Sequence, residues 1–501
     1  MTRWRTMDLA MPATARMWAA IAVVTAAACG NASVPPSRVD VGAARAAPLD
    51  VQSDRAPPPL GAPGVVLWAR RYGGPGTLFP WTLAIDASDR LAIAGSFDKT
   101  ADLGAFHLDA PKRAYGTPQG MFVAWLDASG NVTGARCFGD PGILGRAVLA
   151  AAPDGDWIVA GEFSGVLDFG AGPLDAAGTT TAFVARLGPM GAVRWSKKLG
   201  GAIQQRILDV AVSRAGEIVV AGTFNGGTLD LGGVLMPGHQ LDDVFVAALR
   251  PDGTTRWARS YGDEWGQRVG AVAIDARGDI VLGGELEGTM DFGAGPIGTP
   301  ADPKLGPTSN PAWIAKLDPD GGPRWSRVLS SKRSAIVRDL AIGRGGDIVA
   351  SGIFFEDLRV GDLGVRGEGN TDGFIALLDS AGAPRWATRA GTDHNKDLEQ
   401  AGNVAVDPRG NIAVFGSRTG SDDHSGPVYG MWLASFDALG ATRFVRSHPH
   451  AMGDFLGHLL VTAKDGRAIA LGSFGDPIDL GTGPLDGDRR STSIFLVAFV
   501  P

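Results

Sequence analysis

One pattern recurs seven times along this 501-residue chain, and no other feature constrains its fold as strongly. A chain of this length ordinarily divides into roughly two to four domains, but a fixed-period repeat can absorb it into one closed ring. Each copy reads as an apolar strand, a tight turn, a second apolar strand, a long loop, a third strand, another tight turn and a Trp-bearing strand. The second strands are RLAIAGSF (90–97), DWIVAGEF (156–163), EIVVAGTF (217–224), DIVLGGEL (279–286), DIVASGIF (347–354), NIAVFGSR (411–418) and RAIALGSF (467–474).

The period and the apolar pattern indicate a propeller. The aligned glycine of the second strand returns about every 63 residues, a period that belongs to the propeller class of repeats. Second and third strands, such as VFVAALR (244–250), are apolar on both faces, as expected of strands sandwiched between neighbouring blades. Turns such as DARGD (275–279) have the Asp-x-x-Gly chemistry of short hairpins. The sequence therefore predicts an all-β, seven-bladed β-propeller with four-stranded antiparallel blades.

The fourth strands predict how the ring closes. They are marked by Trp195, Trp257, Trp325 and Trp386, with Cys137 and Phe444 assigned to the same slot, which gives six fourth strands for seven blades. The segment LWARRYGG (67–74) nearly copies RWARSYGD (256–263), so we expect the N-terminal strand to complete the last blade. Closure of this kind removes two unpaired strand edges. Burial of Trp68 alone is expected to contribute at most roughly 4–6 kcal/mol.

The N-terminus predicts export and a lipid anchor. Residues 1–28 combine a basic start with an apolar run (18–28) that is too short for a permanent membrane helix, as in a secretory signal. The run ends in a lipobox-like AAACG, so Cys29 is the expected lipidation site. Ordinary cleavage before residue 29 is the alternative, and it would give a secreted protein. Residues 29–63 are Pro-rich and lack aromatic residues, which predicts a disordered tether before a propeller at 64–501.

The chain resembles the SBBP-type lipoproteins, seven-bladed β-propeller repeat proteins of large-genome bacteria and of myxobacteria in particular. The resemblance covers residues 64–501 and is carried by the strand GDIVLGG (278–284), the loop LDFGAGPL (167–174), the F-V-A-x-L-D strand and the R-W strand. Two departures are the missing D-F-G loop in blade six and Cys137 in place of Trp in blade one. The resemblance implies the fold and export, and it implies no activity.

Charge and motifs argue against several classes of function. The net charge is −7 with both signs interspersed, so no basic stripe is present and nucleic acid is not an expected partner. The G-x-S-x-G, H-E-x-x-H and P-loop patterns are absent. His448, His450 and His458 with Asp454 are spaced closely enough to suggest zinc, but without cysteines or a recurring spacing they are better interpreted as solvated loop residues. We therefore predict no catalytic residues, no metal and no cofactor.

Loop lengths predict which face binds a ligand. The turns that join strands one to two and three to four are short, whereas the two-to-three loops and the blade junctions are longer and vary. Both long sets fall on one face because successive antiparallel strands alternate in direction, and variable loops on a rigid scaffold usually carry binding. The longest loop is 287–311. The candidate residues on this face are Asp263, Glu264, Trp265, Arg268, Arg206 and Arg146.

These candidates have two interpretations each. Trp265 with its charged neighbours has the composition of a protein or glycan contact, but it is equally compatible with a Trp folded over the rim. Arg146, Arg206 and Arg268 occupy corresponding positions in three blades and could surround an anion at the mouth of the central channel. Recurrence of a residue from blade to blade also favours a role in holding blades together.

The combined prediction is a monomeric, exported lipoprotein attached to the membrane by its lipid. Its propeller is expected to be a non-enzymatic scaffold that binds an as yet unknown protein or polysaccharide. The alternatives are a hydrolase or lyase of an extracellular polymer with its site at the central channel, and a structural member of an envelope complex. The sequence does not name the ligand.

Overall fold

A computed structural model gives the fold of residues 61–501 apart from 112–118, 139, 202–203, 301–306, 308, 369–370, 392–397, 423–425, 450, 453–458 and 489. The expected signal (1–28), the lipidation site Cys29 and most of the expected tether (29–63) lie outside these residues. Apart from two 3-10 turns, η1 (Pro189–Gly191) and η2 (Arg344–Gly346), the described residues form strands and loops only. No helix among them is long and apolar enough to cross a membrane.

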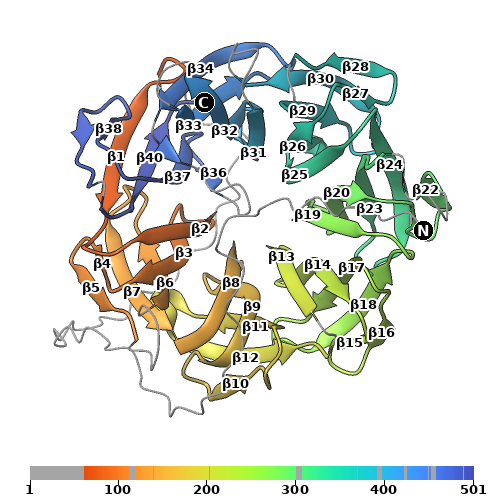
Figure 1. The fold of residues 1–501 in the computed structure, drawn as a ribbon, viewed down its shortest axis with the longest axis horizontal. Helices are drawn as coiled ribbons and strands as arrows, with labels where there is room; N and C mark the ends of the chain where they lie inside the picture. The colour runs from red at the N-terminus through yellow and green to blue at the C-terminus, as the bar shows by residue number, and fades with distance from the viewer. Residues whose placement is uncertain are drawn as a thin grey trace, which may run out of the picture.

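Seven antiparallel sheets stand around one axis, which confirms the predicted seven-bladed β-propeller (Figure 1). Blade one is β2 (Leu78–Ile85), β3 (Leu91–Asp98), β6 (Gln119–Leu126) and β7 (Val132–Phe138). Blade two is β8 (Asp140–Ala151), β9 (Trp157–Asp168), β11 (Thr181–Leu187) and β12 (Val193–Leu199). Blade three is β13 (Gln204–Val212), β14 (Ile218–Asn225), β17 (Asp243–Leu249) and β18 (Thr255–Tyr261).

The second half of the ring repeats this order. Blade four is β19 (Gln267–Ile274), β20 (Ile280–Leu286), β23 (Ala312–Leu317) and β24 (Pro323–Ser331). Blade five is β25 (Ala335–Ile342), β26 (Ile348–Phe354), β29 (Asp372–Leu378) and β30 (Pro384–Ala390). Blade six is β31 (Leu398–Val406), β32 (Ile412–Asp422), β33 (Gly426–Phe436) and β34 (Thr442–Pro449). Blade seven is β36 (Leu460–Thr462), β37 (Ala468–Phe474), β40 (Ser493–Phe499) and β1 (Val66–Tyr72), and β35 (Ala451–Met452) also pairs with β37.

Small hairpins occupy the long two-to-three loops and lie at the outer edge of the ring (Figure 1). The strands concerned are β4 (Thr100–Leu103) with β5 (Phe106–Asp109), β10 (Pro173–Asp175) with the end of β9, β15 (Thr228–Asp230) with β16 (Leu235–Pro237), β21 (Thr289–Asp291) with β22 (Pro296–Gly298), β27 (Asp357–Val360) with β28 (Leu363–Arg366), and β38 (Ile478–Asp479) with β39 (Pro484–Leu485). The β27 strand also pairs with β24, so this hairpin of blade five is joined to blade four. In blade six, where the D-F-G loop is missing, β32 pairs directly with β33 along its full length.

The ring is closed by its two ends, as the copied segment predicted. β1 pairs antiparallel with β40, from Val66 opposite Phe499 to Tyr72 opposite Ile494. Beyond that ladder, the Gly64 N–H donates to the Val500 carbonyl at 2.8 Å. Trp68 is only half-buried, because an outermost strand has a neighbour on one side only, so the expected energy from its full burial was too high.

A bulge in the first strand explains the recurring glycine of the second. In blade three the ladder between β13 and β14 shifts by one residue after Ile207, which pairs with Gly222. A Cβ atom placed on Gly222 would lie 1.9 Å from the Arg206 carbonyl oxygen, and one on Gly284 would lie 1.9 Å from that of Arg268. Only glycine allows this approach of two backbones, which is why the motif recurs.

The Trp slot of blade one was assigned wrongly. Trp195 in β12 pairs with Arg186 of the neighbouring strand. The corresponding pair in blade one is Trp125 with Gly134, while Cys137 pairs with Phe122 three residues further on. The bulge at the start of each fourth strand fixes this register, and aligning the apolar residues Cys137 and Trp195 overlooked it.

Candidate functional site

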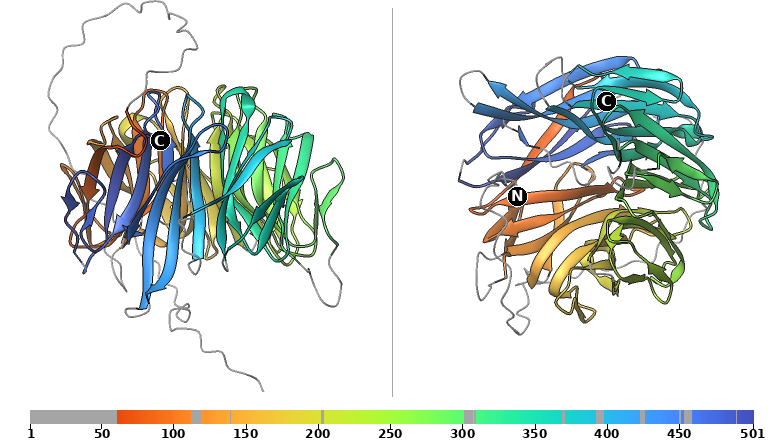
Figure 2. Two further views of the ribbon diagram at one scale, coloured as in Figure 1. Left: turned by 90° about the horizontal axis from the view of Figure 1, so that it is seen from above. Right: turned by 45° about the vertical axis from the view of Figure 1, so that its right-hand side comes forward.

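The two faces of the ring are built differently. Strands one and three run from one face to the other and strands two and four run back, as the ladders require, so all two-to-three loops and blade junctions share one face (Figure 2, left). We call it the loop face, and we call the opposite one, with the one-to-two and three-to-four turns, the turn face. The predicted grouping of the long loops is confirmed.

The turn face consists of repeated joints between blades. Asp318 closes its turn by accepting the N–H groups of Asp320 (3.0 Å) and Gly322 (2.7 Å), and the turn carboxylates Asp127, Asp379, Asp407 and Asp437 do the same at their own turns. The closed turn then receives the Trp of the preceding blade. Trp257 Nε1 donates to the Pro319 carbonyl at 2.9 Å, and Trp195, Trp325 and Trp386 donate in the same way to the next turn along the ring.

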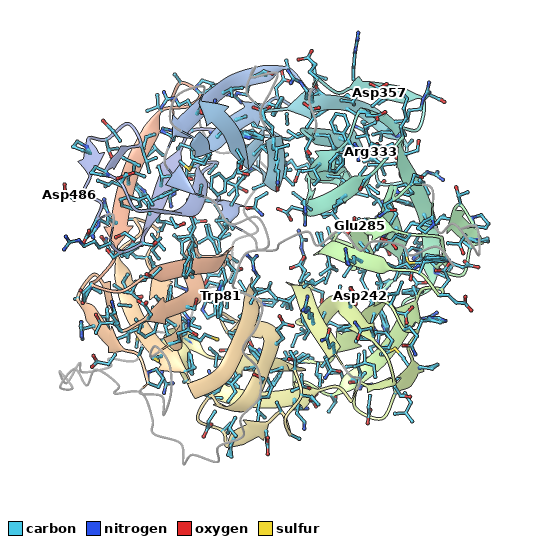
Figure 3. The ribbon with its side chains drawn as sticks, in the orientation of Figure 1. Trp81, Asp242, Glu285, Arg333, Asp357 and Asp486 are labelled. Carbon is cyan, nitrogen blue, oxygen red and sulfur yellow. The ribbon has the colours of Figure 1, made fainter. Side chains whose placement is uncertain are left out.

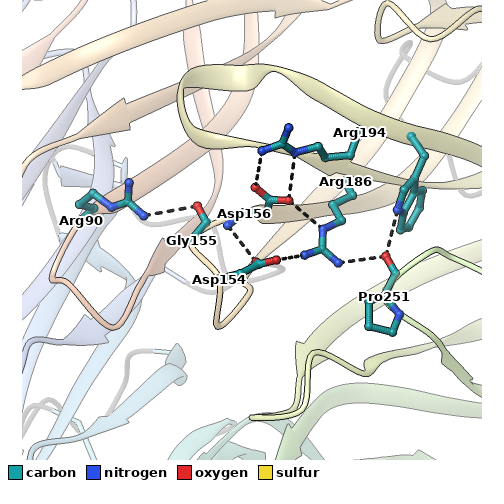
Figure 4. A network of polar contacts seen from close by, with 8 residues as sticks. Arg90, Asp154, Gly155, Asp156, Arg186, Arg194 and Pro251 are labelled. Atoms are coloured by element: carbon teal, nitrogen blue, oxygen red, sulfur yellow. Dashed lines mark hydrogen bonds and ion pairs between the residues drawn. The ribbon is translucent and has the colours of Figure 1, made fainter. Parts of the chain in front are cut away.

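Buried ion pairs reinforce the turn face. Arg186 donates to Asp156 Oδ2 (2.9 Å) and to the Pro251 carbonyl of the next blade (2.9 Å), and it also pairs with Asp154 (Figure 4). In blade four, Lys316 is 2% exposed and lies 2.8 Å from Asp275 and 3.4 Å from Asp279. Such groups are costly to bury unless each charge is matched, and here each is. Their task is to hold the ring together.

On the loop face, the predicted residues around Trp265 separate into two kinds. Asp263 accepts hydrogen bonds from the Trp265 N–H (2.9 Å), the Gln267 amide (2.6 Å) and the Thr289 N–H (2.8 Å), so it fastens a blade junction to the hairpin of blade four. Trp265 is half-buried beside Gly288. Glu264 is exposed. Asp263 therefore supports the loop, whereas Glu264 faces solvent.

The predicted arginines come together at the inner strands of the ring. Arg206 lies opposite Thr223, Arg268 lies opposite Glu285, and Arg146 occupies a bulge that faces Glu162. All three thus stand level with the residue that follows the recurring glycine, near the loop-face end of the first strand. Neighbouring first strands contact each other around the axis, which brings these side chains toward the centre.

A fourth arginine, which sequence reasoning missed, joins them. Arg338 is the bulged residue of β25 and belongs to blade five. Burial lowers the pKa of its guanidinium, the Glu285 charge opposes this, and the charges of Arg146 and Arg268 lower it further. Blades two and five are not neighbours, yet the charge of Arg146 acts on Arg338, as expected of residues on the innermost strands of a ring. We call Arg146, Arg206, Arg268 and Arg338 the axial arginine cluster.

Three carboxylates accompany the axial arginine cluster. Arg206 pairs with Glu162 at 3.2 Å, and Arg268 pairs with Glu285 at 3.2 Å and with Asp242 at 3.3 Å. Glu285 lies on blade four beside the centre of the ring (Figure 3). Burial raises the pKa of Glu162, against the lowering effect of Arg206 and Arg146. The side chains of Arg206 and Arg268 remain 57% and 58% exposed, so both can reach solutes.

The longest loop has a hollow at its end. A space of about 270 Å³ opens between blades four and five, lined by Pro307, Ser309, Asn310, Arg333, Ser334 and Phe355. The Arg333 guanidinium stacks on Phe355, 5.8 Å from the ring centre. Residues 301–306 of this loop are outside the described part of the chain. The hollow thus has one cationic side chain, Arg333, and no catalytic pair among its lining residues.

Metal chemistry finds no support in the part of the chain that the structure describes. No group of three His, Cys, Asp or Glu side chains lies close enough there to hold an ion. Of the histidines weighed above, His450 and His458 lie outside the described residues, as does Asp454. Burial lowers the pKa of His448, and Arg446 adds to that effect, so this imidazole favours the neutral form.

Comparisons with known proteins give distant similarities. No family model matches the chain. A curated relative is an uncharacterised WD repeat-containing protein of Acanthamoeba polyphaga mimivirus, 22% identical over 433 residues, with 71% of this chain and 30% of that protein matched. The chain thus spans about a third of the length of this relative. The resemblance to SBBP-type lipoproteins stays a prediction.

Distant matches among solved structures come from several organisms. One is a protein of unknown function from Dyadobacter fermentans (11% identity, 71% of this chain and 95% of that chain, TM-score 0.36). Another is Sqt1 from Chaetomium thermophilum (12% identity, 87% and 100%, TM-score 0.34). A third is the apocarotenoid oxygenase of Synechocystis (13% identity, 86% and 92%, TM-score 0.35).

Proposed function

We propose that this chain is an exported lipoprotein, anchored through Cys29, whose β-propeller binds a protein or a polysaccharide with its loop face and catalyses no reaction on it. The observation that carries the proposal is that the charged and aromatic side chains of the two faces have different surroundings. On the turn face, carboxylates, cations and Trp side chains form the contacts that close the turns and join neighbouring blades. The loop face carries the non-repeating loops and exposed charged residues such as Glu264, Arg206 and Arg268.

The course of β1 suits an anchored binding module. β40 runs from the loop face to the turn face, and Val66 at the start of β1 pairs with Phe499 at the end of β40. The chain that precedes β1 therefore enters the ring at the turn face. A tether attached there leaves the loop face free to meet ligands away from the membrane. A 35-residue flexible tether has a root-mean-square length of about 30 Å, which gives the propeller room to turn.

Two exposed leucines allow the choice of face to be tested. Leu241 lies on the loop face just before Asp242, and it is 45% exposed. Leu439 lies in a turn of the turn face, and it is 85% exposed. We would screen the full-length protein and its Leu241→Arg and Leu439→Arg variants on a glycan array and on purified envelope proteins. We expect Leu241→Arg to weaken binding and Leu439→Arg to leave it unchanged.

Two results would contradict the proposal. Equal loss of binding in both leucine variants would remove the distinction between the faces, and release of cleaved products from a bound glycan would show an enzyme. The anchor is tested separately by Cys29→Ser, which should move the protein from the membrane fraction to the soluble fraction. Retention of that variant in membranes would exclude lipidation of Cys29 as the anchor.

A further inference from the structure

We propose that the axial arginine cluster binds the carboxylate of an acidic sugar, which makes a uronate-containing polysaccharide the ligand of the loop face. The inference rests on the proposed binding role of that face and is independent of the anchor. Four arginines stand on the innermost strands of blades two, three, four and five. Among the described residues, Glu162 pairs with Arg206, Glu285 and Asp242 pair with Arg268, and no carboxylate is paired with Arg338.

Arg338 has a buried nitrogen that a ligand could pair with. Its Nε is buried and has no hydrogen-bond partner among the described residues. A buried guanidinium nitrogen without an acceptor is costly, and native proteins rarely leave one in that state. Glu285 interacts with Arg338 through its charge, but its carboxylate is paired with Arg268 at 3.2 Å. An incoming oxyanion would supply the missing acceptor.

The pairs Arg206–Glu162 and Arg268–Asp242 join neighbouring blades, but this structural role does not account for the whole cluster. If these arginines were a general device for holding blades together, they would recur around the ring. The positions that correspond to Arg206 and Arg268 carry Phe79 in blade one, Ile336 in blade five and Gln400 in blade six, as the strand registers show. The corresponding position of blade seven lies outside the described residues. Among the blades described at this position, the arginines are therefore confined to one side of the axis, which is what recognition of a single ligand requires.

The neighbouring side chain indicates the kind of oxyanion. Phe79 stands at the same level in blade one, next to the blade of Arg146, and its side chain is 49% exposed. An exposed aromatic ring beside guanidinium groups offers an apolar platform and charged donors together. A uronate has both matching features, since its carboxylate accepts a bidentate pair of N–H bonds and the C–H face of its ring packs on an aromatic ring.

Calorimetry on the full-length protein tests the assignment. The probes are a galacturonate trimer, the neutral galactose trimer and inorganic phosphate. We expect one galacturonate trimer to bind per chain, with the neutral trimer and phosphate at least about tenfold weaker. Added salt should weaken the binding of the acidic trimer, because the donors are partly exposed to solvent.

Three variants separate recognition from folding. Arg338→Gln should bind the acidic trimer about 10- to 100-fold more weakly. Glu285→Gln should bind it a few-fold more tightly, because a competing carboxylate is removed, and a gain of this kind does not arise from a damaged fold. Arg256→Gln is the matched control. Arg256 pairs with Glu217 at 2.7 Å on the turn face, so its loss should leave the dissociation constant unchanged.

Each outcome of these binding measurements either supports the inference or overturns it. Equal affinity for the acidic and neutral trimers, tighter binding of phosphate than of galacturonate, or unchanged binding by Arg338→Gln would overturn the inference. If Arg338→Gln fails to fold, the direction of the Glu285→Gln effect decides. Binding of neutral glycans at the loop face with no axial site would refute this inference alone. Absence of any ligand for the loop face would refute the proposed function as well.

Discussion

The turn face and the loop face of this propeller both carry charged residues, but these residues differ in their surroundings. On the turn face, Lys316 and Arg186 are enclosed by carboxylates and by the next blade, so their charges are neutralised by partners within the fold. On the loop face, Arg206 and Arg268 are paired but more than half exposed. Burial and the number of partners therefore distinguish these charged residues of the two faces. The largest effect is expected at the closure on which both faces depend.

Deletion of residues 64–74 should have the largest effect. It removes β1 from β40 and opens the ring, with a loss of about 5 kcal/mol or more and a melting temperature lower by about 10 °C or more. Scanning calorimetry measures this directly. Deletion of residues 31–60 is the control and should leave the melting temperature unchanged. Equal melting of the two deletion variants would contradict closure by β1.

Lys316→Met should cost about 3–5 kcal/mol, because it leaves Asp275 buried without its cation and Asp279 with Arg324 alone. Lys332→Met is the matched change on the loop face. The Lys332 side chain is 67% exposed and 3.5 Å from Asp357, so its loss should change stability by less than about 0.5 kcal/mol. Urea unfolding of the two variants gives the comparison. Similar costs would remove the contrast between the faces.

The Lys316 effect should also depend on pH. Burial raises the pKa of Asp275, but the hydrogen bond from Lys316 and the backbone N–H bonds outweigh it, so the pKa is held below its ordinary value of 3.8. A lowered carboxyl pKa contributes stability above 3.8 that is lost as pH falls through the lowered pKa. Lys316→Met should therefore be closest to wild type in acid, where the Asp275 carboxyl is protonated. A penalty that grows in acid would show that Lys316 acts in another way.

Trp257→Ala should destabilise the protein by about 2–3 kcal/mol, since it empties the joint between blades three and four. Trp257→Phe keeps most of the packing and loses only the hydrogen bond to the Pro319 carbonyl, so about 0.5–1.5 kcal/mol is expected. Chemical denaturation measures both. If Trp257→Ala were neutral, the repeated Trp would have no role in joining blades.

Asp263→Ala and Glu264→Ala test the loop face at two adjacent positions, and the effect should be the smallest of the series. Asp263 accepts four hydrogen bonds, from Trp265, Gln267 and Thr289, so its loss should cost about 1–2 kcal/mol. Glu264 is exposed, and its loss should stay within about 0.5 kcal/mol. Thermal melts of the pair are sufficient. The reverse order would mean that Glu264 supports the junction and that Asp263 faces the ligand.

Period and pattern predicted the architecture because each blade repeats the same local chemistry. The seven glycine-bearing strands set the number of blades, and the near copy of 256–263 at 67–74 identified the closing strand. In the recurring D-F-G loops, Asp168 and Asp291 form Asx-type turns with their following glycines. These features depend on residues close together in sequence, and sequence patterns report such contacts well.

The features that the sequence did not show depend on register and on contacts between blades. Arg338 carries no distinguishing pattern, because a one-residue bulge turns it toward the axis, and a bulge of this kind leaves no clear trace in the apolar alternation. The mistaken Trp slot of Cys137 has the same origin. The structural role of Asp263 depends on Gln267 and Thr289, and the second of these belongs to a different loop.

Closure between β1 and β40 completes blade seven and seals the ring that carries both faces, so its amide protons give the most direct test. Hydrogen exchange should show β1 amides, from Trp68 to Tyr72, protected to the same degree as those of β18, the corresponding strand of blade three. The Val500 N–H, which donates to the Val65 carbonyl at 2.9 Å, should be protected with them. Exchange of β1 at the rate of an unstructured peptide, with β18 protected, would contradict the closed ring.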